Sequence, residues 1–178
     1  MKGSSYIRIS HRDVRRKISN FKSYDFSRKV LGGDWDLNTS LIEDNEKFIS
    51  IRQRFLQGVA WEDTDIFLGH YARPFARGER VRGCRTQSQL LRYYNRRVDG
   101  MYRNIKAKGI RTPGLFNRIE PLYVYIGRDG ELLWGSGGNH RFAMAKILEL
   151  ENIPVKIRTR HADFKVTNSF LQRFELQE

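Results

Sequence analysis

The 178-residue chain is 39% hydrophobic and 12% aromatic, which is too apolar for a disordered protein, and it has no uninterrupted apolar run long enough to span a membrane. One cysteine, Cys84, excludes an internal disulfide framework and a zinc site made of cysteines. The formal net charge of +13 favours polyanionic partners, whether nucleic acid, a nucleotide or an anionic surface, and without an apolar span no membrane partner is expected.

Residues 1–5 lack the apolar segment of a secretory signal, so we expect a cytoplasmic protein. Residues 6–29 are basic, and Val14, Ile18 and Phe21 follow one another at i, i+4 and i+7. This spacing predicts a short amphipathic helix. Its basic side either contacts phosphates or is simply solvated.

The next stretch, Val30-Leu31-Gly32-Gly33-Asp34-Trp35-Asp36, predicts a short strand and a Gly-Gly turn. In one interpretation Trp35 packs in the core and the aspartates bond nearby N–H groups. In the other, Asp34 or Asp36 faces a phosphate site, as a magnesium ligand or as the base that removes a proton from a hydroxyl group.

Residues 43–57 predict a helix because Phe48, Ile51 and Phe55 recur on one side. The acidic residues that follow, at 62, 63 and 65, are typical of a helix N-terminus, although such a patch can also hold a divalent ion.

Between Tyr71 and Arg97 the chain is rich in arginine and aromatic residues, and the part before Thr86 has the composition of a loop. Guanidinium groups suit phosphates and aromatic faces suit bases, so this is the candidate surface for a polynucleotide. The candidate nucleic-acid-binding residues are Arg73, Arg77, Arg80, Arg82, Arg85 and Arg92, and the run continues through Arg96 and Arg97.

Ser88 to Lys108 predicts a long helix with one broad apolar face, ended by Gly109, and Pro113-Gly114 marks a loop. Leu122–Ile126 and Glu131–Trp134 predict a β-hairpin. A helix from Phe142 and a strand over Ile153–Ile157 follow, and the apolar spacing of residues 162–178 predicts a closing helix.

The junction between the hairpin and the helix is Gly135-Ser136-Gly137-Gly138-Asn139-His140-Arg141. Glycines allow close approach of a ligand, and the first turn of a helix offers unpaired N–H groups. A capped helix after a tight turn would explain the glycines, but not His140 and Arg141 together. The candidate phosphate-binding residues are Ser136, Gly137, Gly138, Asn139, His140 and Arg141.

Gly138 to Arg141, followed by an alanine-rich helix and Ile153-Pro154-Val155, resembles the signature of the ParB/sulfiredoxin-like superfamily. The resemblance is closest over residues 94–161. It implies an α+β, ParB/sulfiredoxin-like fold: a small mixed sheet packed with helices. Residues 1–92 would be an N-terminal helical extension, 93–161 the core and 162–178 the closing helix of one compact domain.

The resemblance and the junction together predict a nucleotide-binding protein that holds the phosphates of ATP, CTP or a related nucleotide, with magnesium (Mg). If the protein is an enzyme, the reaction would be that of a phosphotransferase or an NTPase. The candidate catalytic residues are His140, Asp34 and Asp36. A cysteine-dependent sulfiredoxin is disfavoured, because Asn139 stands where that chemistry needs a thiolate. The alternatives are a DNA- or RNA-binding module that uses the arginine-rich surface, a ParB-like nuclease, or an assembly protein without chemistry.

Overall fold

The computed structural model of the chain describes residues 6–112 and 120–174. The expectations for residues 1–5 and for the loop at Pro113-Gly114 lie outside these ranges. The chain divides into two compact units. The first contains Met1–Ile42, Gly109–Gly138 and Glu149–Glu178, and the second contains Glu43–Lys108 and Asn139–Leu148.

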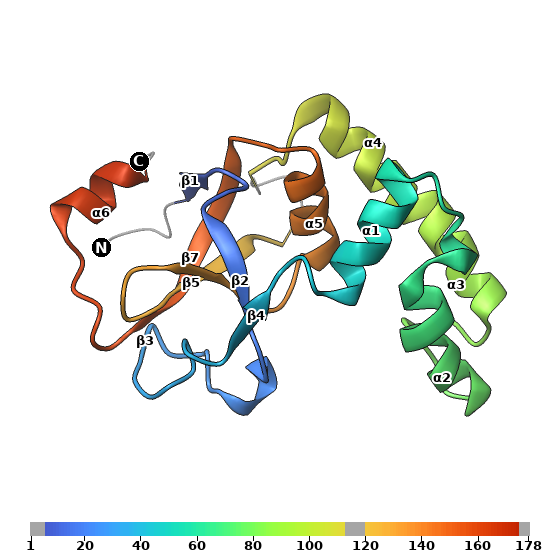
Figure 1. Cartoon of the computed structure of the whole chain (residues 1–178), viewed down its shortest axis with the longest axis horizontal. Coiled ribbons are helices and arrows are strands. Elements are labelled where there is room, and N and C mark those ends of the chain that lie inside the picture. Colours follow the sequence, from blue (N-terminus) through green and yellow to red (C-terminus); the bar gives the residue numbers. More distant parts are fainter. Residues whose placement is uncertain (1–5, 113–119, 175–178) are drawn as a thin grey trace. The chain divides into compact units, whose positions relative to one another are not determined.

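The first unit holds a mixed sheet in the order β1-β7-β5-β6-β2-β4, with β3 also paired to β7 (Figure 1). The β5·β7, β6·β2 and β3·β7 pairs are parallel and the other pairs are antiparallel. The expected α+β class with a mixed sheet is therefore confirmed. The strands are β1 (Ile7–Ile9), β2 (Val14–Ile18), β3 (Val30–Leu31), β4 (Thr39–Leu41), β5 (Leu122–Ile126), β6 (Leu132–Trp134) and β7 (Ile153–His161).

The hairpin prediction is confirmed, since β5 and β6 pair across a tight turn in which Gly130 has φ 80°. The predicted strand at Val30–Leu31 is also present. The helix expected from Val14 is wrong, because Val14–Ile18 forms β2, paired with β6 and β4. A spacing of four keeps two residues on one face of a strand as well as of a helix. Phe21 instead begins a single 3₁₀ turn, η1 (Phe21–Ser23).

The first unit has an aromatic core built from the sheet and the segment that follows β2. Its buried residues are Ile18, Phe26, Trp35, Tyr125 and Leu133. The ring of Phe26 lies 4.8 Å from that of Tyr125 and 5.3 Å from that of Trp35, both edge-on. Burial raises the pKa of Tyr125 to about 12. Part of the closing segment forms the helix α6 (Asn168–Arg173), which is shorter than expected and is capped by Thr167.

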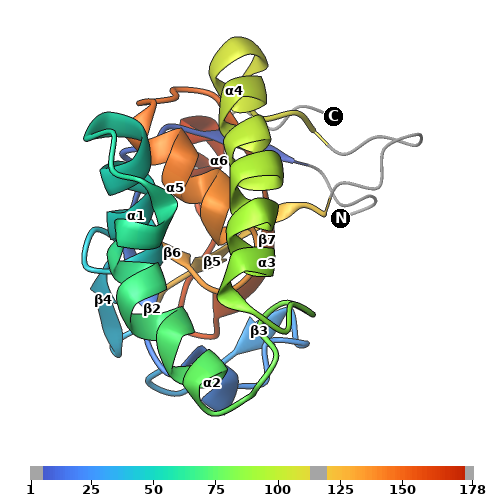
Figure 2. The same ribbon diagram turned by 90° about the vertical axis from the view of Figure 1, so that its right-hand side faces the viewer.

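The second unit is helical in its described residues. Its elements are α1 (Glu46–Leu56), η2 (Trp61–Asp63), η3 (Ile66–Tyr71), α2 (Ala72–Ala76), α3 (Gln87–Tyr93), η4 (Tyr94–Val98), α4 (Asp99–Lys108) and α5 (Asn139–Ile147). Helices α1 and α4 pack on α5 (Figure 2).

The predicted helices over residues 43–57 and from Ser88 to Lys108 are confirmed, the second as the continuous run α3, η4 and α4 (Figure 2). Both η3 and η4 are π-helical. The loop expected before Thr86 is wrong in its first part, where α2 continues directly from η3, and correct in the turns after Ala76.

We expect Gly135→Ala to lower the free energy of unfolding by about 1–3 kcal/mol, the usual cost of overpacking a core. A Cβ atom at this position would overlap the rings of Tyr125 and Phe21. Gly69→Ala is the matched control, because nothing lies within 4 Å of the added atom in this helical segment. Urea unfolding of the two variants should show a large loss for the first and none for the second.

Candidate functional site

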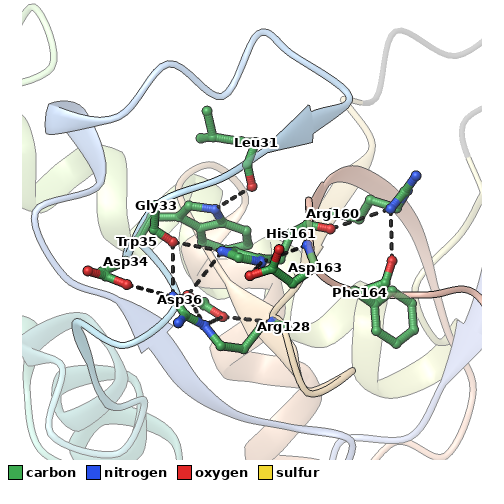
Figure 3. Close-up of polar contacts among 10 residues, drawn as sticks. All are labelled: Leu31, Gly33, Asp34, Trp35, Asp36, Arg128, Arg160, His161, Asp163 and Phe164. Atoms are coloured by element: carbon green, nitrogen blue, oxygen red, sulfur yellow. Dashed lines mark hydrogen bonds and ion pairs between the residues drawn. The ribbon is translucent and has the colours of Figure 1, made fainter.

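Asp34 and Asp36, the candidate acids, both bind Arg128 (Figure 3). The Asp36 carboxylate accepts the backbone N–H of Arg128 at 2.7 Å and its guanidinium at 2.9 and 3.0 Å. Asp34 accepts the same guanidinium at 2.8 Å. Only 4% of the Asp36 side chain is exposed, against 78% for Asp34. Asp36 is therefore a buried carboxylate neutralised by one arginine, and Asp34 lies at the surface.

His161 lies beside this pair and has both ring nitrogens occupied. Its Nε2 lies 2.7 Å from the carbonyl oxygen of Gly33, so Nε2 carries the proton, and Nδ1 accepts the N–H of Asp163. Trp35 donates its indole N–H to the Leu31 carbonyl at 3.0 Å (Figure 3). The Gly-Gly turn is thus bound by His161 at the end of β7 and by Arg128 in the turn between β5 and β6.

Burial by itself raises the pKa of Asp36, but the hydrogen bonds from Arg128 outweigh burial and hold the pKa below its ordinary value. The Asp36 carboxylate is therefore ionised and hydrogen-bonded. Asp36 and Asp34 both stabilise the turn by binding Arg128. The sequence did not reveal the partner, because Arg128 lies 92 residues from Asp36. Their catalytic role stays a prediction, and they belong to the first unit whereas His140 belongs to the second.

The glycine-rich junction has the local backbone that its sequence predicts. Gly137 has φ 87° and Gly138 has φ 59°, a region that favours glycine, and α5 begins at Asn139. Ser136 and Gly137 are exposed. The residues up to Gly138 belong to the first unit and those from Asn139 to the second.

His140 takes part in a chain of hydrogen bonds inside the second unit. Its Nε2 lies 3.2 Å from the hydroxyl of Tyr94, which lies 2.6 Å from the hydroxyl of Tyr71. The charge of Arg82 acts on both of these hydroxyls. Both tyrosines are buried, at 0% exposure for Tyr94 and 3% for Tyr71.

The positive charge of Arg82 acts on both hydroxyls and favours the direction in which their oxygens face the guanidinium and their protons point toward His140. In this direction Tyr71 donates to Tyr94, and Tyr94 donates to Nε2 of His140. In this direction no buried hydroxyl proton is left without an acceptor. His140 is then neutral with its proton on Nδ1. Burial, followed by the charges of Arg82 and Lys47, lowers the pKa of His140 to about 3, which agrees with this assignment.

No pattern in the sequence points to Tyr71 and Tyr94 as partners of His140. They are separated from it by 46 or more residues and occupy apolar positions of helices, where a tyrosine is ordinarily part of the core. An Nε2 atom that accepts from Tyr94 does not donate to a phosphate. Any phosphate contact at this turn would thus depend on backbone N–H groups, Asn139 and Arg141.

The six arginines expected to bind nucleic acid are all exposed. Arg77 pairs with Glu79, and Arg82 occupies a turn with φ 52°. Further along, Arg92, Arg96 and Arg97 line a hollow of about 630 Å³ together with Tyr93. The structure thus brings one residue of the candidate set, Arg92, into a cavity with two arginines of the same run.

Comparisons of the chain with models of protein families, with curated proteins and with solved structures found no match. Within residues 6–112 and 120–174, no three histidine, cysteine, aspartate or glutamate side chains are grouped so that they could hold a metal ion. No helix in the described part of the chain is long and apolar enough to cross a membrane.

We expect the neutral, partly buried His140 to make the protein less stable in acid. Its pKa of about 3 lies below the ordinary 6.5, so the unfolded chain takes up a proton as the pH falls below about 6.5 and the folded chain does not. Urea unfolding at pH 6.5, 5.5 and 4.5 should show a smaller loss of stability across this range in His140→Gln than in the unaltered protein. Equal losses would contradict the assignment, as would a protonated His140 above pH 5 in NMR spectra.

Proposed function

We propose that the protein binds nucleic acid through the arginine-rich surface of its second unit. The observation that carries the proposal is the hollow lined by Arg92, Arg96, Arg97 and Tyr93. All three arginines are exposed, and none pairs with a carboxylate within the described residues. Three unneutralised guanidinium groups around one hollow offer several phosphate contacts at once, which suits a phosphate backbone.

The surrounding sequence strengthens the local field. Residues 71–108 contain eleven arginines and lysines and two acidic residues. Both acids are already paired, Glu79 with Arg77, and Asp99 with Arg54 at 2.7 Å and with the indole of Trp61. Since the acids are used internally, the positive charge of the surface is left for an external partner.

The ordinary alternative is a basic face that is merely solvated. Nine of the eleven basic residues are arginine. Arginine presents a planar fork that binds phosphate oxygens in pairs, whereas lysine is the more strongly hydrated cation. The preference for arginine and the presence of a cavity with an aromatic wall favour binding over solvation.

The triple variant Arg92→Ala, Arg96→Ala, Arg97→Ala should weaken binding to a 20-nucleotide strand and make binding less dependent on salt. Each phosphate contact that is lost lowers the slope of log K against log salt by roughly 0.7–0.9, so we expect a decrease of about 2–3. Fluorescence anisotropy between 50 and 200 mM salt measures both effects.

The matched control is the triple variant Arg12→Ala, Arg28→Ala, Arg173→Ala, which removes the same charge from the first unit. Each of these exposed arginines pairs with a carboxylate. The control should keep nearly the full affinity and slope. If the two triple variants lose affinity equally, only net charge matters and the assigned surface is wrong.

A second candidate function is nucleotide binding at residues 136–141, within a ParB/sulfiredoxin-like fold. It is favoured by the left-handed Gly137 and Gly138 directly before α5, which is the backbone of a phosphate-binding turn. ATP or CTP with magnesium at 100 times its dissociation constant should stabilise the protein by about 2.7 kcal/mol.

Thermal unfolding with a panel of nucleotides, with and without magnesium, measures this stabilisation. Arg141→Ala should abolish it and Arg12→Ala should not. If no nucleotide raises the unfolding temperature, the nucleotide-binding proposal loses its support. The proposal that the protein binds nucleic acid does not depend on this result.

A further inference from the structure

The ring of Tyr93 is held in place from two sides. Tyr93 is the last residue of α3, and its ring meets the ring of the buried Tyr94 edge-on, with the centroids 5.9 Å apart. The guanidinium of Arg82 lies over the Tyr93 ring, 5.9 Å from its centroid. Tyr93 nevertheless lines the hollow and is only half-buried.

Arg82 is itself fixed. It takes the left-handed conformation, φ 52°, which is strained for any residue other than glycine, in the turn closed by the Val81–Cys84 bridge. Its charge also acts on the buried hydroxyls of Tyr71 and Tyr94, in the chain of hydrogen bonds that ends at His140. The Tyr93 ring therefore has two supports, the guanidinium of Arg82 and the ring of Tyr94.

A rigid aromatic ring in a cavity with three unneutralised arginines combines two kinds of contact. The arginines suit phosphate oxygens, and the ring offers a face on which a planar base can stack. A paired duplex keeps its bases stacked inside, so only an unpaired base can enter the hollow and reach Tyr93.

We propose that this hollow is a site for an unpaired base of single-stranded nucleic acid, which stacks on Tyr93 while Arg92, Arg96 and Arg97 bind the flanking phosphates. This inference rests on the proposed function. It adds that the nucleic acid is single-stranded and that stacking on Tyr93 provides the preference for single strands. Stacking tolerates any base, so the site is selective for single strands and not for sequence. DNA and RNA share the chemistry, and the experiment separates them.

The decisive experiment uses the unaltered full chain and labelled 15-nucleotide ligands in fluorescence anisotropy at 100 mM salt. The ligands are oligo(dT), oligo(rU), an abasic strand with the same phosphates, and a duplex of the same length. We expect oligo(dT) or oligo(rU) to bind at least fivefold more tightly than the abasic strand, the lower end of what stacking of one base provides. The tighter of the two identifies the natural sugar, and the duplex should bind no better than the abasic strand.

Tyr93→Leu should bring the ratio between normal and abasic strands close to one, and Tyr93→Phe, which keeps the ring, should preserve it. Tyr123→Leu is the matched control, because Tyr123 is also half-buried and lies under Arg158, 5.1 Å from the ring centroid, in the first unit. It should leave the ratio unchanged. The comparison with the abasic strand needs no variant, so it decides the question even if Tyr93→Leu fails to fold.

Salt-dependent binding that is equal for normal, abasic and duplex ligands would overturn the base site and leave the proposed function standing. A ratio that survives Tyr93→Leu in a folded protein would also overturn it, because the stacking contact would lie elsewhere. Failure to bind any of the ligands at 50 mM salt would overturn the proposed function, and the base site with it.

Discussion

The helical unit depends on satisfying the buried hydroxyl of Tyr94. A hydroxyl that is removed from water without a partner costs several kcal/mol, and Tyr94 is completely buried. Tyr71 and His140 supply its partners from η3 and α5, and the rings of Trp61 and Phe67 pack on it at 4.8 and 5.0 Å. One phenol therefore joins four elements that the sequence keeps apart.

The same interaction gives His140 a partner that the sequence did not predict, while its role in phosphate binding or catalysis stays a prediction. An imidazole nitrogen in the first turn of a helix can bind a phosphate only if that nitrogen has no hydrogen-bond partner within the protein. The Tyr94 hydroxyl lies 3.2 Å away and takes the Nε2 atom. Once its ring is buried there, the cost of charging it lowers its pKa to about 3 and keeps it neutral. His140, which raised the functional interest of the junction, is thus a partly buried residue bonded to the core of the helical unit.

The parts of the fold that the sequence predicted are those in which periodicity or turn chemistry is unambiguous. The β5–β6 hairpin has a turn with glycine at its left-handed position, and the run from Ser88 to Lys108 keeps one apolar face through Leu90, Tyr94, Val98 and Ile105. Strand β2 was missed because Val14 and Ile18 fit either period.

The partners in the polar clusters were beyond prediction for a different reason. Arg128 with Asp36, and Tyr94 with His140, are pairs formed by the tertiary fold across 92 and 46 residues. A single sequence contains no local pattern for such contacts. The arginine-rich surface could be predicted because composition alone reports charge. The hollow and the position of Tyr93 in its wall could not, because they depend on which side of the helix each side chain faces.

The π-helical turn of η4 is what separates the core from the charged surface. In a regular α-helix the residues three and four positions after Tyr94 share its face, so Arg97 would lie beside the buried ring. The wider turn of a π-helix shifts the register, so that Asp99 joins Val98 among the buried residues while Arg96 and Arg97 stay exposed. Asp99 then finds Arg54 and Trp61 inside, so it does not neutralise the arginines outside. A single irregular turn thereby buries Asp99 with its partners and leaves the arginines of the same segment exposed to a ligand. The irregular helix and the unpaired positive charge therefore occur in the same short segment.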